Sequence, residues 1–222
     1  MPRQRRTGSY AVGRARQDAI LDTATERFAQ AGYHRTSMGQ IAADVGLSEP
    51  GLRHHFPTKK HLLVAVAGRR FDLLATWARE APRPDDGTRP FRVMLSITER
   101  MVTQPGLIEL FVLMSAEAAG PASPAHVLYA THYDQVVRAI AGEFRSTAEQ
   151  GFLRADIDYE AVARRYIAMS DGLQLQWVLS GGALDLVGLM RGYLEQLALT
   201  LQASPDPLDL GRGDRPLGSG AR

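Results

Sequence analysis

Apolar residues recur every three or four positions through most of this chain, which is the spacing of one face of an α-helix. The first such stretch places Ile20, Ala24 and Phe28 on a common face. It predicts a helix over residues 17 to 31. Gly32 follows directly and can adopt the left-handed backbone conformation that often ends a helix.

Two shorter helices are predicted next, over residues 38 to 45 and 49 to 56. Ser37 and Gln40 have the spacing of a capping box at the start of the first of them. Gly46 then allows a tight turn between the two helices. Two short helices joined by a glycine turn form a helix-turn-helix, an arrangement that reads duplex DNA.

Beyond this unit, segments rich in Pro and Gly recur at intervals of about one helix length, and no segment has the two-residue period of a strand. The fold class predicted is therefore all-α, with about nine helices, three in a small N-terminal domain and six in a larger C-terminal one. The six later helices are expected over residues 59 to 80, 90 to 103, 107 to 119, 124 to 150, 159 to 180 and 184 to 202.

The pattern divides the chain into four parts. Residues 1 to 16 form a basic, flexible arm that is either simply disordered or in contact with phosphates or a minor groove. Residues 17 to 63 form the helix-turn-helix domain, and residues 64 to 203 form the larger helical domain. Residues 204 to 222 are rich in Pro, Gly, Asp and Arg without an apolar face, and we expect them to be disordered.

Charge and composition add limits on function. Residues 1 to 60 hold ten Lys or Arg against five Asp or Glu, which suits phosphate binding, although a solvated charged surface has the same composition. The absence of cysteine excludes disulfides and cysteine-ligated metals. The N-terminus lacks the apolar core of a signal peptide, and the most apolar stretch, residues 107 to 119, is too short to span a bilayer. We therefore expect a cytoplasmic protein without membrane contact.

A series of residues across positions 17 to 63 stands in the register of a known regulator signature. The series is Phe28, Gly32-Tyr33, Thr36-Ser37, Ile41-Ala42, Gly46-Leu47-Ser48 and Leu52-Arg53-His54-His55-Phe56-Pro57-Thr58-Lys59. It resembles the N-terminal signature of the TetR family of transcriptional regulators. One position departs from that signature, because Arg53 replaces the usual tyrosine and brings five guanidinium donors in place of one hydroxyl.

The resemblance implies a double-stranded DNA operator as partner. The first turn of a recognition helix points into the major groove, and the flanking helix ends face phosphates. Candidate base or groove contacts are Glu49, Pro50, Gly51, Arg53 and His54, and candidate phosphate contacts are Thr36, Ser37, His55 and Lys59. Ser48 completes the predicted set as the cap of the third helix, and Ser37 is equally well explained as a cap alone.

The last two predicted helices carry apolar stripes that either pack within the chain or form the homodimer interface that the resemblance implies. Ile167, Leu175 and Val178 lie outside the main stripe, so more apolar surface is present than intramolecular packing requires. The predicted dimerisation residues are Tyr166, Leu173, Leu186, Leu189, Met190, Tyr193 and Leu197. A two-fold dimer would bind a pseudo-palindromic operator.

Residues 171 to 177 look like the C-terminal half of a TetR subgroup related to betaine-type (BetI-like) repressors, which implies a small-molecule effector bound among the fourth to eighth helices. The candidate ligand-binding residues are Trp77, Met94, Met101, Phe111, Met114, Tyr129, Tyr133, Asp171, Gln174 and Trp177. Each of them is otherwise explained as plain core. Nothing in the sequence identifies the effector.

Together these observations predict a ligand-responsive DNA-binding transcriptional regulator, most often a repressor released from its operator by a small molecule. An activator of the same family, or a helical interaction protein that has lost DNA binding, are the alternatives. An enzyme is not expected, because the turn at residues 46 to 50 lacks the second glycine of a nucleophile elbow. No metal or cofactor is expected either, because the adjacent His54 and His55 point apart on a helix.

Overall fold

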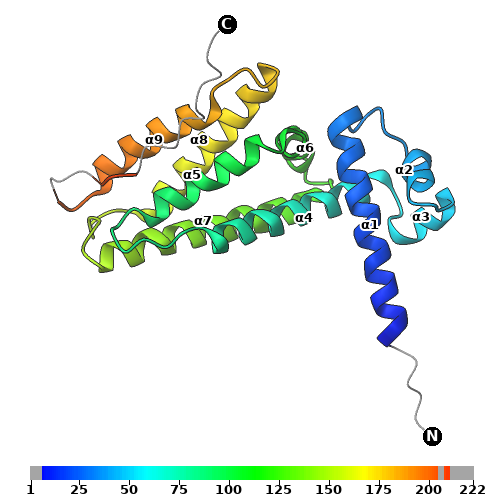
Figure 1. Ribbon diagram of the computed structural model, residues 1–222, viewed down its shortest axis with the longest axis horizontal. Helices are drawn as coiled ribbons and strands as arrows, with labels where there is room; N and C mark the ends of the chain where they lie inside the picture. Colours follow the sequence, from blue (N-terminus) through cyan, green and yellow to red (C-terminus); the bar gives the residue numbers. More distant parts are fainter. Residues whose placement is uncertain (1–6, 205–207, 211–222) are drawn as a thin grey trace, which may run out of the picture.

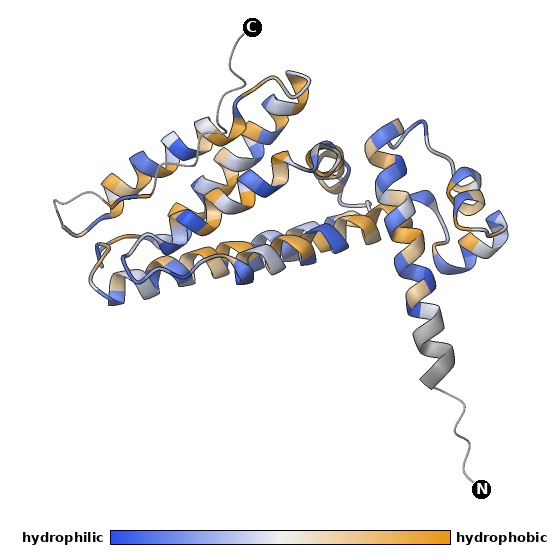
Figure 2. Ribbon diagram, in the orientation of Figure 1, coloured by the Kyte–Doolittle hydropathy of each residue, from blue (hydrophilic) through white to orange (hydrophobic). Residues whose placement is uncertain are grey.

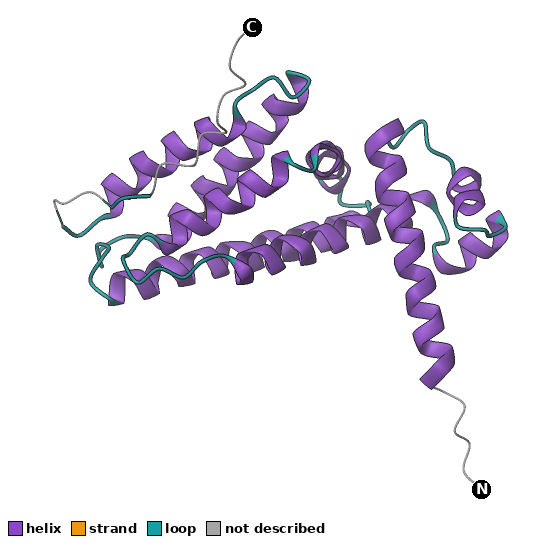
Figure 3. Cartoon of the chain, in the orientation of Figure 1, coloured by secondary structure: helices purple, strands orange, loops and turns teal. Residues whose placement is uncertain are grey.

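The computed structural model describes residues 7 to 204 and 208 to 210 of the chain, and within them all regular structure is helical (Figures 1 and 3). The helices agree with the predicted ones to within two residues at nearly every end. They are α1 (Thr7–Ala31), α2 (Met38–Asp44), α3 (Glu49–His55), α4 (Lys59–Glu80), α5 (Arg89–Val102), α6 (Pro105–Ala118), α7 (Ala125–Glu149), α8 (Tyr159–Leu179) and α9 (Leu186–Leu201).

The start of α1 is the main correction to the predicted boundaries. The helix begins at Thr7, so residues 7 to 16, expected in a flexible arm, are helical. The prediction was wrong because it required an apolar stripe, and α1 continues through residues 7 to 16 without one. The arginines at positions 3, 5 and 6 lie outside the described residues.

The helix caps and the glycine turns predicted for the helix-turn-helix are present. The Ser37 hydroxyl accepts a hydrogen bond from the backbone N–H of Gln40 (3.2 Å), and the Gln40 side chain accepts one from the Ser37 N–H (2.8 Å), which completes the capping box. Gly32 and Gly46 have φ angles of 81° and 65°, a region that favours glycine. Thr58 caps α4 by accepting a hydrogen bond from the His61 N–H (3.3 Å).

Two hydrophobic clusters hold the molecule together. The N-terminal cluster joins α1, α2 and α3 to the first half of α4, to α6 and to the start of α7, and the C-terminal cluster joins the end of α4 to α5, α7, α8 and α9. The N-terminal cluster includes Ile20, Phe28, Ile41, Leu52, Phe71, Phe111 and Met114. The C-terminal cluster includes Trp77, Phe91, Met101, Ile108, Phe144, Leu186 and Met190. Figure 1 shows α4 running from the helix-turn-helix into the larger bundle.

Helix α6 lies at the junction of these clusters, and Figure 1 shows it nearly end-on between α1 and the larger bundle. Ile108 belongs to the C-terminal cluster, whereas Leu110 and Phe111 belong to the N-terminal one. A Cβ atom built on Gly106 would lie 2.0 Å from the Cβ of Ala29, so α6 and α1 touch through a residue without a side chain. The helix-turn-helix domain is thus packed directly on the larger domain.

The segment after α9 contains a second correction. Leu210, expected in a disordered tail, is 6% exposed and belongs to the C-terminal cluster, and the Asp209 carbonyl accepts a hydrogen bond from Arg92 (2.9 Å). The prediction looked for a helical apolar face, but a single leucine is buried here in a segment without regular secondary structure. The rest of the predicted tail from residue 211 lies outside the described residues.

Candidate DNA interface and effector site

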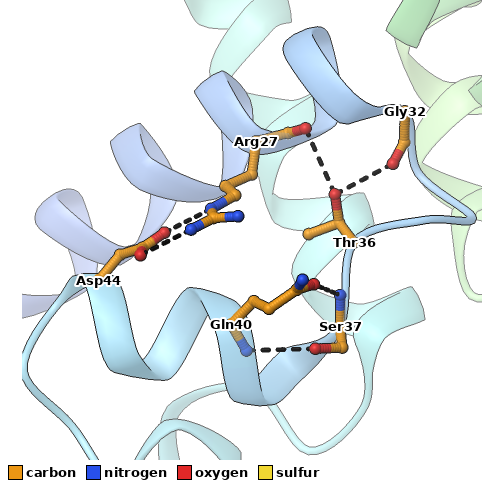
Figure 4. Close-up of polar contacts among 6 residues, drawn as sticks. All are labelled: Arg27, Gly32, Thr36, Ser37, Gln40 and Asp44. Atoms are coloured by element: carbon orange, nitrogen blue, oxygen red, sulfur yellow. Dashed lines mark hydrogen bonds and ion pairs between the residues drawn. The ribbon is translucent and has the colours of Figure 1, made fainter.

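The loop before α2 is fixed by Thr36 and Arg27 (Figure 4). The Thr36 hydroxyl lies 3.0 Å from the Gly32 carbonyl and 3.3 Å from the Arg27 carbonyl, and the side chain is 2% exposed. The Arg27 guanidinium also binds both carboxylate oxygens of Asp44 on α2, at 2.5 and 2.8 Å. The predicted phosphate contact at Thr36 is therefore wrong for its side chain, because that hydroxyl is buried and donates to the end of α1.

Ser37 and Ser48 are exposed caps. The oxygen of Ser48 accepts a hydrogen bond from the Gly51 N–H at 3.2 Å, as that of Ser37 does from Gln40. Because capping uses only an acceptor lone pair, each hydroxyl proton stays available to a phosphate oxygen. The structure thus supports both roles for these serines, and their contact with DNA stays a prediction.

On α3, Arg53 and Glu49 form one unit. Glu49 Oε1 accepts hydrogen bonds from Arg53 Nη2 (2.7 Å) and Nε (3.0 Å), and Arg53 Nη1 donates to the Pro57 carbonyl (3.1 Å). The other carboxylate oxygen, Oε2, lies 3.1 Å from the position a Cβ would take on Gly39 of α2. Glu49, predicted as an independent base contact, therefore orients Arg53 in this structure.

The remaining predicted contacts on α3 lie at or near the surface. Pro50 and His54 are exposed, and His55 and Gly51 are partly buried. Leu52, on the opposite side, is fully buried. The helix therefore presents a polar face while its apolar face fills the N-terminal cluster, and DNA contact by these four residues stays a prediction.

Lys59, at the start of α4, has a partner inside the chain. Its ammonium lies 4.2 Å from the centre of the Tyr33 ring, a cation–π contact. Partial burial lowers the pKa of Lys59 below its ordinary value. A cation at the N-terminus of a helix interacts unfavourably with the helix dipole, and this alone would suggest a bound anion beside Lys59. The Tyr33 ring compensates part of that unfavourable interaction. A phosphate contact by Lys59 stays a prediction.

In the larger domain, Arg70 of α4 points into the interior. It is 4% exposed, its Nη2 donates to Gln174 Oε1 (3.2 Å) and to the sulfur of Met101 (3.5 Å), and its guanidinium carbon lies 4.5 Å from the centre of the Phe111 ring. Its Nε is buried without a hydrogen-bond partner. Met101 and Phe111 belong to different clusters, so Arg70 lies where the two clusters meet.

An aromatic group from α4 and α7 adjoins Arg70. Phe71 stacks on His132 with ring centres 3.5 Å apart, and Tyr133 donates a hydrogen bond to Asp171 Oδ2 (2.5 Å). Burial, and then the Arg70 charge, lower the pKa of His132 to about 4, so its ring is neutral at pH 7. Burial also raises the pKa of Asp171, against the opposing effects of Tyr133 and Arg70.

The structure therefore brings together only part of the predicted effector set. Met101, Phe111 and Gln174 contact Arg70, and Tyr129, Tyr133 and Asp171 lie close enough to affect its pKa. Ligand contact stays a prediction for these six and for the others, which are packed inside one of the two clusters. Those others are Trp77, Met94, Met114 and Trp177.

Sequence analysis missed Arg70 itself, although a signal was present. Leu63, Val66, Arg70, Leu74 and Trp77 follow at steps of three and four residues. An arginine within such a stripe is placed inward, where charged side chains are rare.

Two family models match separate parts of the chain. Residues 20 to 66 match the model of bacterial regulatory proteins of the TetR family, and residues 102 to 199 match the C-terminal model of BetI-type transcriptional repressors. The protein belongs to the TetR family of transcriptional regulators. The predicted family and the all-α fold with nine described helices are thus confirmed.

Individual TetR-family proteins match over different lengths. The transcriptional activator FasR of Mycolicibacterium smegmatis is 36% identical over 84 residues, which are 38% of this chain and 38% of FasR. The chain thus spans well under half of that relative. An HTH-type transcriptional repressor of Rhodococcus jostii is 25% identical over 209 residues, 86% of this chain and 92% of the repressor.

Two solved structures match most of the TetR-family fold described above. A transcriptional regulator from Saccharomonospora viridis in complex with choline has a TM-score of 0.70 at 26% identity, covering 84% of this chain and 97% of that one. A TetR regulator from Haloarcula marismortui has a TM-score of 0.76 at 16% identity, covering 85% of this chain and 98% of that one. The second likeness supports the fold alone.

The predicted dimerisation residues of this TetR-family chain divide by exposure. Tyr166, Leu173, Leu186 and Met190 are at most 7% exposed and pack in the C-terminal cluster of a single chain, so the prediction was wrong for these four. They form the stripe that faces inward. Leu189 is 46% exposed, and Tyr193 and Leu197 are partly buried. Their place in an interface stays a prediction.

No helix in the described part of the chain is both long enough and apolar enough to cross a membrane, and Figure 2 shows hydrophilic and hydrophobic positions mixed along α5, α8 and α9. The described residues also contain no group of three His, Asp or Glu side chains placed to hold a metal ion.

Proposed function

We propose that this protein is a cytoplasmic, homodimeric transcriptional regulator that binds a pseudo-palindromic DNA operator through α3 and changes its affinity when a small molecule binds between α4 and α8. The observation that carries the proposal is the exposed polar face of α3, with Arg53 held in a fixed orientation by Glu49. A guanidinium presented in this way suits bidentate recognition of a guanine edge or a phosphate.

Two exposed apolar helix faces support the dimer. Leu175 and Leu179 on α8 are 45% and 77% exposed, and Leu189 and Leu199 on α9 are 46% and 52% exposed. A Cβ on Gly192 of α9 would meet nothing within 4 Å, so a partner helix can approach closely there. We propose that these faces pack against their copies in a second chain, which would place the two α3 helices on successive half-sites.

Helix α4 supports a mechanism for the response. It begins in the DNA-reading domain at Lys59 and ends in the bundle, and two adjacent arginines link it to both parts. Arg69 pairs with Asp22 of α1 at 2.7 Å, whereas Arg70 contacts Met101 and Gln174. We propose that an effector that changes the surroundings of Arg70 displaces α4, and α1 with it. Only a modest coupling energy, about 1 to 3 kcal/mol, is typical of such regulation.

The test is selection and sequencing of DNA fragments bound by the full-length protein, followed by gel shifts on the enriched sequence. Wild type should enrich a two-fold-related sequence. Arg53→Ala should weaken specific binding by about 1 to 3 kcal/mol, and Lys59→Ala should weaken all DNA binding and flatten its salt dependence. Enrichment of no sequence at all would reject the function and favour an interaction protein.

Activation is a second candidate outcome, because the FasR match carries the description of an activator whereas the Rhodococcus match is a repressor. A reporter under the enriched operator, with and without the regulator gene, separates the two. Higher expression without the gene indicates a repressor, and lower expression indicates an activator.

A further inference from the structure

Arg70 is a buried cation whose contacts are all with neutral groups. Gln174 Oε1 and the Met101 sulfur accept from Nη2, and Phe111 lies beside the guanidinium plane, while Nε has no partner. Among the described residues, no carboxylate forms an ion pair with it. A charge taken out of water is normally paired, because its lost hydration must be replaced.

The unpaired group lies on the edge of the guanidinium that binds carboxylates elsewhere in this molecule. Arg27 holds both oxygens of Asp44 through Nε and Nη2, at 2.5 and 2.8 Å (Figure 4). Arg154 holds Asp156 through the same two nitrogens, at 3.0 and 2.7 Å. On Arg70 this edge offers one donor without a partner and a second nitrogen held only by neutral acceptors, one of them a weak thioether.

Asp171, whose charge acts against the lowering of the Arg70 pKa by burial, does not fill that role. Asp171 lies on α8 one turn before Gln174, but its Oδ2 accepts the Tyr133 hydroxyl at 2.5 Å, and burial raises the pKa of its carboxyl. Gln174 is in turn fixed by donating to the carbonyl and hydroxyl of Ser170, both at 3.2 Å. Asp171 and Gln174 are thus committed to other partners, and no carboxylate of the described chain binds the Nε–Nη2 edge of Arg70. An anion bound at that edge would provide its direct counter-charge.

We propose that the effector of this regulator is an organic acid, whose carboxylate or phosphate head binds the Nε–Nη2 edge of Arg70 and whose apolar body contacts the surrounding aromatic side chains. The assignment rests on the proposed function, because it identifies the class of molecule that the regulator senses. It differs in charge from choline, the ligand in the Saccharomonospora viridis structure.

The surroundings of Arg70 suit such a molecule. Phe71, Phe111 and Tyr129 provide apolar ring surface in contact with one another or with the guanidinium. His132 and Tyr133 are only partly buried, so the group reaches the surface on the α7 side. Met101 is the contact most easily displaced, because its side chain is unbranched and its sulfur a weak acceptor. A head group arriving there would join residues of the two clusters through Arg70.

The first experiment measures binding without DNA. Full-length protein is titrated with butanoate, octanoate, dodecanoate, phenylacetate and octyl phosphate, and with octanamide and choline as neutral and cationic probes, and the melting temperature (Tm) is recorded. We expect at least one acid to raise Tm while octanamide and choline do not, and the carboxylate and phosphate arms show which head group is preferred. Equal stabilisation by octanamide or choline, or none by any acid, overturns the proposal.

Variants then test whether Arg70 carries the effect. Arg70→Gln should weaken acid binding about tenfold or more, because a charge-assisted bidentate contact is lost, while Arg70→Lys should retain part of it. Arg79→Gln, an exposed arginine on the same helix, is the matched control and should bind acids like wild type. Asp171→Asn should tighten acid binding several-fold, because a nearby acidic group is removed.

The stability of the ligand-free Arg70→Met protein distinguishes an anion site from a purely structural role for Arg70. If the site awaits an anion, Arg70→Met should raise the Tm of the ligand-free protein by about 2 °C or more, since an uncompensated buried charge is replaced by an apolar chain of similar length. A lower Tm for Arg70→Met, together with unchanged acid affinity for Arg70→Gln, would show that Arg70 serves packing and would overturn the proposal.

Two separate assays distinguish this inference from the proposed function. Acid binding is read on protein alone, and operator binding is read by gel shift. Acid binding without any sequence-specific DNA binding would reject the proposed function and leave the anion site standing. If the protein binds a specific DNA sequence but no acid changes that binding or the Tm, the proposed function stands and the acid is rejected as effector.

Discussion

At the scale of single residues, the departure of Arg53 from its family's tyrosine is accompanied by an acidic partner one turn earlier. An exposed ion pair of this kind contributes little to stability. In the proposed complex with DNA its consequence is for recognition, because Glu49 occupies two of the five donors of Arg53 and compensates its charge. Under that proposal, base recognition by Arg53 depends on a residue that need not touch a base.

Glu49→Gln should strengthen binding to non-specific DNA several-fold and weaken discrimination, because Arg53 gains charge and freedom. The slope of log affinity against log salt concentration should steepen by about one. The measurement is a salt titration of operator and random duplexes. Glu109→Gln, an exposed position on α6, makes the same charge change away from α3 and is the control. An unchanged slope for Glu49→Gln would mean that the pair has no effect on DNA binding.

His132 gives a pH dependence at the same scale. Its pKa is about 4 in the folded chain, against an ordinary value of 6.5 for histidine, so between these values the unfolded chain takes up a proton that the folded chain does not. Stability is therefore full above pH 6.5 and falls as the pH drops toward 4. His132→Phe, which keeps the stacking on Phe71, should lose less stability over this range.

Urea denaturation at several pH values measures this, with the exposed His34→Phe as control. The difference between wild type and variant is the quantity to compare, because Asp171, whose pKa is raised, acts in the opposite direction. Parallel stability curves for wild type and His132→Phe would contradict the assignment.

At the scale of elements, the contact of α6 with α1 joins the two domains. Gly106→Ala should destabilise the protein by about 1 to 3 kcal/mol, because the new methyl group would overlap Ala29 and part of its backbone. Gly142→Ala, within α7 and facing open space, should be neutral or stabilising by up to about 1 kcal/mol. Urea denaturation compares them, and equal effects would show that the α1–α6 contact is not tight.

At the scale of the whole molecule, the proposed homodimer depends on the exposed apolar faces of α8 and α9. Leu189→Arg should give a monomer at micromolar concentration and lower operator affinity about a hundredfold or more, because two half-sites no longer bind together. Sedimentation and gel shifts measure this. Val127→Arg is the control, since Val127 on α7 is 72% exposed and outside the proposed interface. If the Leu189→Arg protein is still a dimer, the interface lies elsewhere on the molecule.

The sequence alone determined most elements that depend on local chemistry. Gly32, Gly46, Ser37 and Thr58 set helix ends through backbone conformation and capping, and both are properties of a few neighbouring residues. The family signature added the DNA-reading unit. Local reasoning did not give the start of α1, because residues 7 to 16 lack an apolar stripe and include two glycines, which are unfavourable inside a helix.

Only the tertiary structure decided which partners distant residues have. Thr36 turned from a predicted DNA contact into a buried donor because α1 ends beside it, and more than half of the predicted dimer stripe proved to face inward. Arg70 shows the difference most clearly. Its position in an apolar stripe was visible in the sequence, but its unpaired Nε depends on groups up to 104 positions away. Such contacts follow from the packing of several helices against one another, which no local pattern contains.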